Sequence, residues 1–150
     1  MKFGFINLLG EIIVILLLIP NIIYALKKKK TENNAEQSVP KLLSVLEQIG
    51  RYACMALMIL PVLVWEFGFK SKGGFLAYLI LNVCLIIAYY IVWALYMKKP
   101  SLKSGMTLAV IPTCIFLFSG LLLHHWLLVG LAVFFGVSHC KLTYITHQAL

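Results

Sequence analysis

Long stretches of apolar residues alternate with short polar segments along the whole chain. The apolar residues are distributed as several stretches of membrane-spanning length and not as one core. About 20 apolar residues in an α-helix cross the hydrocarbon core of a bilayer. The pattern therefore predicts an all-α, polytopic transmembrane helical bundle with five spans. We expect them at about residues 3–26, 44–66, 75–97, 105–123 and 126–146.

The longest polar segment, KKKKTENNAEQSVPK at residues 27–41, has no periodic apolar face and predicts a linker. Ser38 and Pro40 then have the residue types typical of a helix start. From Leu42 the apolar positions recur at helical spacing. A helix from Pro40 to Glu66 would be about 40 Å long, so we expect its first turns to lie among lipid headgroups.

Residues 105–140 form the ambiguous part of the pattern, because they are long for one span and barely sufficient for two. His124, His125 and Trp126 interrupt the stretch near its middle. Such side chains suit a membrane interface better than a bilayer centre. We therefore predict two helices joined by a water-accessible turn at the two histidines. The alternative is one long tilted helix and a four-span protein.

Composition supports a single membrane domain over residues 1–150. The chain is 62% hydrophobic and 12% charged, whereas a soluble domain is about half apolar and a quarter charged. The net charge of +8 comes from lysines at the ends of apolar stretches. This placement is typical of topology signals that contact membrane lipids, so no nucleic-acid partner is expected.

The distribution of the 13 Lys and Arg residues predicts the orientation. With the amino terminus outside, ten of them face the cytoplasm and three face outward, which is the usual bias. The linker at 27–41 and the carboxyl terminus are then cytoplasmic. We expect a multi-pass protein of a cell membrane, with the bacterial plasma membrane as its location.

Glu11 is the most unusual residue within a predicted span. An acidic side chain inside a bilayer costs about 2.5–3.5 kcal/mol even on lenient scales, so it usually faces a partner or a cavity. Asn7, Glu11 and Asn21 share one face of the first span. We expect Glu11 to face the bundle interior and to hydrogen-bond with Asn82. The alternative is a purely structural hydrogen bond between helices.

Other polar residues fall at a similar depth and predict one outward-facing ligand pocket. Its expected members are Asn7, Glu11, Glu66, Tyr78, Asn82, His124 and His125.

Glu47 and Arg51 have the i, i+4 spacing of a local ion pair at the cytoplasmic start of the second span. Arg51, together with Lys41, is also a candidate for binding lipid headgroups.

Two helix faces carry patterns that favour packing. An aromatic stripe on the third span is more typical of packing and interface anchoring than of a ligand site; its members are Tyr78, Asn82, Tyr89, Trp93 and Tyr96. Ala132, Gly136 and Cys140 form a small-residue seam on the fifth span. The four histidines and four cysteines do not converge in the predicted topology, so no metal site is expected.

Three functions remain open from the sequence. The favoured one is binding or transport of a small ligand or ion through the outward-facing pocket. The second is a non-catalytic accessory or immunity-type protein that binds another membrane protein. The third is a membrane-embedded enzyme acting on a lipid. The sequence contains none of the common catalytic or nucleotide-binding motifs, so no catalytic residue and no cofactor is predicted.

Overall fold

The computed structural model describes residues 2–4, 6–29, 40–60, 62 and 67–148. Within them the chain forms five α-helices: α1 (Leu8–Lys29), α2 (Lys41–Ile59), α3 (Lys72–Lys98), α4 (Leu102–Leu122) and α5 (Trp126–Gln148). All five are long and apolar enough to cross a membrane. The predicted number of helices is thereby confirmed. The orientation in the membrane stays a prediction, and residues 30–39 of the expected linker lie outside the described residues.

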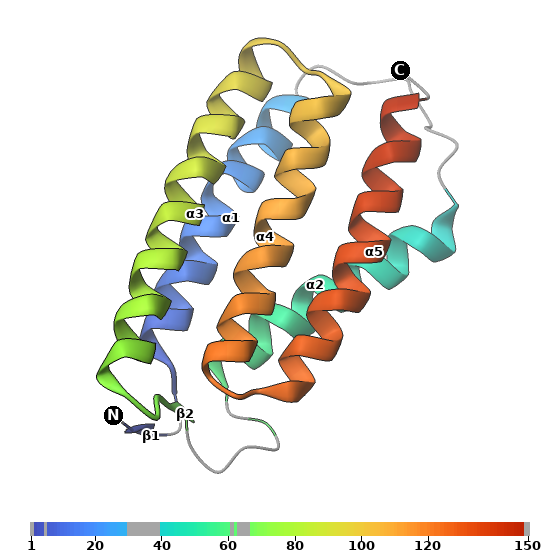
Figure 1. Ribbon diagram of the computed structural model, residues 1–150. Helices are drawn as coiled ribbons and strands as arrows, with labels where there is room; N and C mark the ends of the chain where they lie inside the picture. The colour runs from blue at the N-terminus through green and yellow to red at the C-terminus, as the bar shows by residue number, and fades with distance from the viewer. Residues whose placement is uncertain (1, 5, 30–39, 61, 63–66, 149–150) are drawn as a thin grey trace.

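The helices pack side by side in a closed ring (Figure 1). Helix α3 contacts α4, α4 contacts α5, and α5 contacts α2. Helix α1 lies behind α3 and closes the ring, because it contacts both α2 and α3. Helix α2 crosses behind α5 at a steep angle to the other helices. The centre of the ring is therefore bordered by all five helices.

The first helix begins later than expected. Residues Lys2–Gly4 form a short strand, β1, which pairs antiparallel with β2 (Phe67–Gly68). Asn7 then fixes the helix start: its backbone N–H donates to the Ile59 carbonyl at 2.9 Å, and its side chain donates to the Met58 carbonyl at 3.2 Å. These bonds hold residue 7 at the end of α2, so α1 starts at Leu8.

The second helix ends earlier than expected, at Ile59 and not at Glu66. Leu60 is extended, with φ −110° and ψ 134°. The sequence explains this break, because Pro61 disfavours the helical conformation in the residue before it. The helix of 19 residues is about 28 Å long, so the expected length of about 40 Å is wrong. Glu66 lies outside the described residues.

Serine caps start α3 and α4. Ser71 Oγ accepts a hydrogen bond from the Gly74 N–H at 3.0 Å, and Ser101 Oγ accepts one from the Ser104 N–H at 3.2 Å. These hydroxyls satisfy backbone donors that have no partner inside the first turn. Both helices consequently start three residues before the predicted positions of 75 and 105.

The turn between α4 and α5 confirms the prediction of two helices. His124 adopts a left-handed backbone conformation, with φ 56°, and the chain reverses there (Figure 1). His125 Nδ1 accepts a hydrogen bond from the Leu128 N–H at 3.2 Å and so caps α5. The single long helix of the four-span alternative is not formed.

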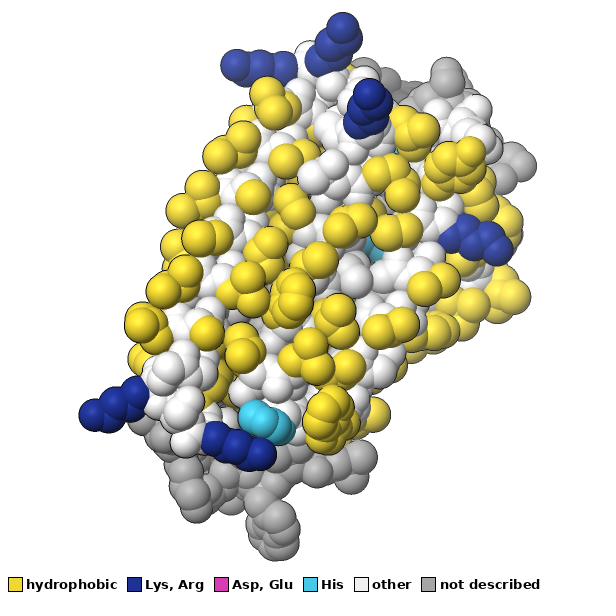
Figure 2. All heavy atoms as spheres, in the orientation of Figure 1, with side chains coloured by type: hydrophobic (Ala, Val, Ile, Leu, Met, Phe, Trp, Pro, Cys, Tyr) yellow, Lys and Arg dark blue, Asp and Glu magenta, His cyan; other side chains and the backbone are white. Residues whose placement is uncertain are grey.

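Helices α4 and α5 share the most extensive contact in the bundle, and they approach closely at a glycine. A Cβ atom on Gly136 would lie 2.4 Å from Thr113 Cγ2. This supports the predicted small-residue seam on α5, with Ala132 also buried. The outer surface of the bundle is apolar (Figure 2): hydrophobic side chains cover the visible flank, and most Lys and Arg side chains lie toward its two ends. An apolar surface of this kind is suited to contact with the hydrocarbon tails of lipids.

Candidate functional site

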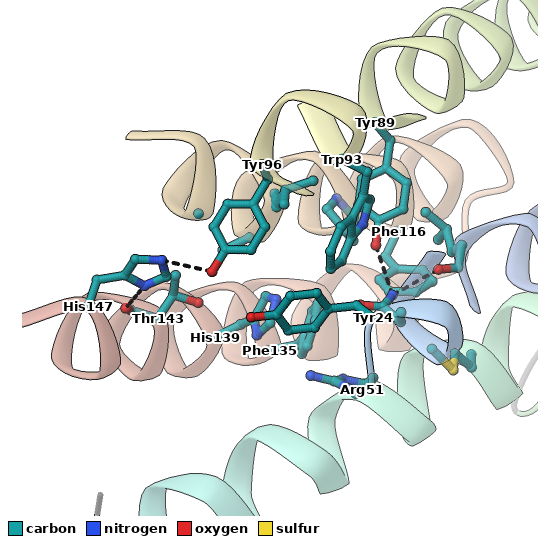
Figure 3. Close-up of a pocket in the computed structure, with 17 residues that line it drawn as sticks. Tyr24, Arg51, Tyr89, Trp93, Tyr96, Phe116, Phe135, His139, Thr143 and His147 are labelled. Atoms are coloured by element: carbon teal, nitrogen blue, oxygen red, sulfur yellow. Dashed lines mark hydrogen bonds between the residues drawn. The ribbon is translucent and has the colours of Figure 1, made fainter. Parts of the chain in front are cut away.

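A cavity of about 220 Å³ lies between the helices, and all five of them line it (Figure 3). It occupies the half of the bundle that holds the connection between α3 and α4. Its walls combine aromatic rings with a few polar side chains, which is the usual composition of a small-molecule site.

One wall is aromatic and comes mainly from α3. The Trp93 ring lies 5.2 Å from that of Tyr24 on α1, 5.7 Å from that of Tyr96 and 6.3 Å from that of Tyr89, measured between ring centroids. Figure 3 shows these rings gathered beside the cavity. The buried residues of α3 are the five of the predicted stripe, Tyr78, Asn82, Tyr89, Trp93 and Tyr96. The periodicity therefore identified the inward face of this helix correctly.

Hydrogen bonds fix one side of this wall. Asn21 of α1 donates from Nδ2 to the Tyr89 hydroxyl at 2.8 Å and to the Leu17 carbonyl at 2.8 Å. Trp93 is only 6% exposed, and its indole N–H faces the Tyr89 hydroxyl but forms no hydrogen bond of standard geometry with any group in the described part of the chain. A buried donor of this kind is costly unless a ligand or a water molecule accepts from it.

The charged side of the cavity is a three-residue cluster. Arg51 donates from Nε to Glu47 Oε1 at 3.0 Å, one helical turn away on α2. His139 Nδ1 of α5 lies 2.9 Å from the same carboxylate oxygen. Glu47 is 2% exposed and Arg51 33% exposed. Arg51 and His139 line the cavity, whereas Glu47 lies behind them. The ion pair predicted from the sequence is confirmed, and α5 supplies a third member.

Ring stacking positions His139. Its imidazole stacks on Phe135, with ring centroids 4.9 Å apart and planes inclined by 17°. Phe135 lies one helical turn earlier on α5 and is itself buried.

A link between α3 and α5 lies at one end of the cavity. The Tyr96 hydroxyl lies 3.1 Å from His147 Nε2, and His147 Nδ1 lies 2.9 Å from the Thr143 carbonyl oxygen. Gly105 of α4 makes room for this imidazole, because a Cβ atom there would lie 2.6 Å from His147 Cε1. Figure 3 shows His147 at one end of the group of labelled side chains.

Part of the expected outward-facing site also converges, at the opposite half of the bundle. Asn7, Tyr78 and Asn82 are all buried there. Asn82 accepts a hydrogen bond from Ser119 Oγ at 3.3 Å and donates to the Tyr78 carbonyl at 2.9 Å. The Tyr78 hydroxyl faces Asn7 and Ser119.

The remaining predicted site residues lie elsewhere. Glu11 is partly exposed, and the expected hydrogen bond to Asn82 is not formed, because Asn82 bonds to Ser119 and Tyr78 instead. His124 is exposed at the turn, but His125 is fully buried, so the expectation of a water-accessible turn is wrong for His125. Lys41 is exposed at the start of α2. Glu66 lies outside the described residues.

The sequence interpretation did not assign the cavity. Tyr89, Trp93 and Tyr96 were visible as a stripe, and Glu47 and Arg51 as a pair. Each of these patterns lies on a single helix, so neither of them indicated that α1 and α5 would complete a common site. No group of three His, Cys, Asp or Glu side chains able to hold a metal ion occurs among the described residues.

Comparison with known proteins assigns no family to this arrangement. No protein-family model matches the chain, and neither a curated protein nor a solved structure matches it. The function therefore has to be argued from the cavity itself.

Proposed function

We propose that this chain is a multi-pass membrane protein that binds, and in its membrane transports, a small ligand held in the cavity between its five helices. This keeps the function favoured by the sequence but moves the site. The site now lies in the lysine-rich half of the bundle, which the charge distribution predicts to be cytoplasmic.

The observation that carries the proposal is a cavity of about 220 Å³ whose walls come from every helix. Protein interiors are close-packed, and voids larger than a water molecule are few. At about 30 Å³ per water molecule, this space equals roughly seven waters. It is therefore suited to a ligand the size of a single substituted ring.

Its chemistry supports the same function. Aromatic side chains provide the apolar walls, and Arg51, His139 and the Trp93 indole N–H provide polar groups at fixed positions. Ligand sites combine these two kinds of surface.

The test is binding of single-ring probes to the purified protein in phosphatidylcholine nanodiscs. Radiolabelled benzoate, benzamide and benzylamine are each measured by equilibrium dialysis. We expect at least one of them to bind with one site per protein. Ala109 lines the cavity and is 1% exposed, so Ala109→Leu fills part of the space and is expected to weaken binding at least about tenfold by steric exclusion.

The matched control is Ala94→Leu, which makes the same change on the exposed face of α3. It is expected to leave binding unchanged. Absence of binding by all three probes, or an equal effect of the two substitutions, overturns the proposal. The accessory-protein function would then take first place.

A further inference from the structure

We infer that the ligand of this cavity carries an oxyanion, a carboxylate or a phosphate, which Arg51 and the Trp93 N–H hold against the aromatic wall. The inference rests on the proposed function and specifies the chemical class of the ligand. Three observations carry it: the unused donors of Arg51, the charge of the residues that line the cavity, and the buried indole N–H of Trp93.

Arg51 is positioned to bind more than Glu47. Its guanidinium group has five N–H donors in one plane. The interaction with Glu47 engages the edge formed by Nε and one terminal nitrogen. The other edge has no hydrogen-bond partner among the described residues, and the side chain lines the cavity. A planar fork of this kind matches carboxylate and phosphate oxygens.

The charge of the side chains that line the cavity favours an anionic ligand. Among the described residues that line the cavity, one is an arginine, two are histidines, and none is Asp or Glu. The nearby carboxylate of Glu47 is buried and already faces both Arg51 and His139. A cationic ligand would therefore lie near Arg51 without a free counter-charge, although the aromatic rings alone would suit a cation. An anionic ligand would instead be attracted by the positive charge of Arg51.

Trp93 supplies an independent indication. Its indole N–H is a donor with no acceptor function. It is buried, lines the cavity and faces the Tyr89 hydroxyl, but it forms no hydrogen bond of standard geometry in the part of the chain that the structure describes. A ligand with an acceptor atom on this side would complete the hydrogen bonding of the indole, and an oxyanion provides several such atoms.

The probes of the binding assay separate the charges, because benzoate, benzamide and benzylamine share one ring and differ in charge at neutral pH. A charge-assisted hydrogen bond to Arg51 is expected to make benzoate bind about tenfold tighter than benzamide. Benzylamine is expected to bind weakest. This comparison uses the wild-type protein and does not depend on how any variant folds.

Two variants locate the effect. Glu47→Gln combined with Arg51→Gln removes both charges together, so no buried carboxylate is left unpaired, and is expected to lower benzoate binding to the level of benzamide. Trp93→Phe keeps the ring but removes the donor, and is expected to weaken benzoate binding about fivefold. Trp126→Phe is the control, because Trp126 is 67% exposed and does not line the cavity.

The oxyanion could belong to a free organic acid or to a lipid headgroup. An additional binding experiment with a different lipid composition distinguishes these two sources. Phosphatidylcholine also carries a phosphate, but its choline group cancels the charge, so nanodiscs containing the net-anionic phosphatidylglycerol suppress benzoate binding if Arg51 binds an anionic lipid headgroup. They leave it unchanged if the natural ligand is a free acid. Both results agree with an oxyanion at Arg51.

The inference is wrong if benzamide or benzylamine binds as tightly as benzoate, or if the double variant keeps the preference for benzoate. In that case Ala109→Leu still weakens binding of the preferred probe, and the proposed function stands without its anion. Absence of binding by every probe rejects the function itself.

Discussion

Glu47 and His139 meet across the interface of α2 and α5, with 2.9 Å between a carboxylate oxygen and Nδ1. This contact extends the ion pair of Glu47 and Arg51, which belongs to a single helix, into a link between two helices. The cluster is both a stabilising element and one side of the cavity. We expect these two roles to be separable, because stability depends on the balance of charge around Glu47, whereas the proposed ligand would bind the free edge of Arg51.

We expect Arg51→Gln to destabilise the protein by about 1–3 kcal/mol, because the buried carboxylate of Glu47 loses its main partner. Adding Glu47→Gln is expected to restore much of this loss. Unfolding by dodecyl sulfate in mixed micelles, followed by circular dichroism, measures the four free energies of a double-mutant cycle. Additive effects of the two substitutions would show that the pair is not coupled.

Two glycines of α5 provide a matched test of helix packing. Gly136→Ala is expected to cost about 1–3 kcal/mol, because the added methyl group would overlap the Thr113 side chain. Gly130 has open space around its Cα, with no atom within 4 Å of an added Cβ. Gly130→Ala is therefore expected to stabilise the helix by about 0.5–1 kcal/mol. The same unfolding assay measures both, and equal effects would contradict the close approach of α4 and α5.

His125 predicts a loss of stability in acid. Burial lowers the pKa of His125 below its ordinary value of 6.5, and its Nδ1 must stay unprotonated to accept from the Leu128 N–H. The unfolded chain therefore binds the proton more tightly than the folded protein. The stabilising contribution is complete above about pH 6.5 and is lost as the pH falls below that value, at up to about 1.4 kcal/mol per pH unit.

Unfolding midpoints between pH 5 and pH 8 test this for the wild type and two variants. His125→Asn retains a side-chain cap but removes the titration, so its stability is expected to depend less on pH than that of the wild type. His124→Asn is the control, because His124 is exposed and asparagine tolerates its left-handed backbone. A wild-type slope that survives in His125→Asn would assign the effect to another group.

The orientation is tested at two exposed connections. Ser71 precedes α3, and Pro100 lies between α3 and α4. In a protein whose four cysteines are replaced by alanine, we expect Ser71→Cys to react with a membrane-impermeant maleimide on intact cells. Pro100→Cys is expected to react only after permeabilisation. The reverse pattern would place the amino terminus and the outer turn in the cytoplasm.

The sequence predicted the number of helices better than the positions of their ends. Five apolar stretches were sufficient for the number of helices, because a span needs a fixed length of apolar residues. The starts of α3 and α4 were missed by three residues, although the caps Ser71 and Ser101 are visible in the sequence. The start of α1 depends on bonds from Asn7 to Met58 and Ile59, and no local pattern shows these.

The same distinction applies to the site. The stripe of Tyr89, Trp93 and Tyr96 follows from helical spacing and was identified, but its role as a cavity wall depends on how α1 and α5 are rotated toward it. Glu11 was predicted to be a site residue because acidic side chains are rare within membrane spans. The structure instead buries Glu47, which the sequence placed at an interface. A tertiary partner, His139, accounts for that difference.

The place of α5 in the ring, between α4 and α2, also has a consequence for biogenesis. Helix α5 is synthesised after the other four helices and supplies Phe135, His139 and His147, so the cavity cannot form before α5 is inserted. Until then, Glu47 lacks its partner from α5. A chain that ends early would expose a charged pair on α2 to lipid, a state that is costly in a bilayer. Insertion of α5 is therefore the step that both buries this charged pair and completes the cavity.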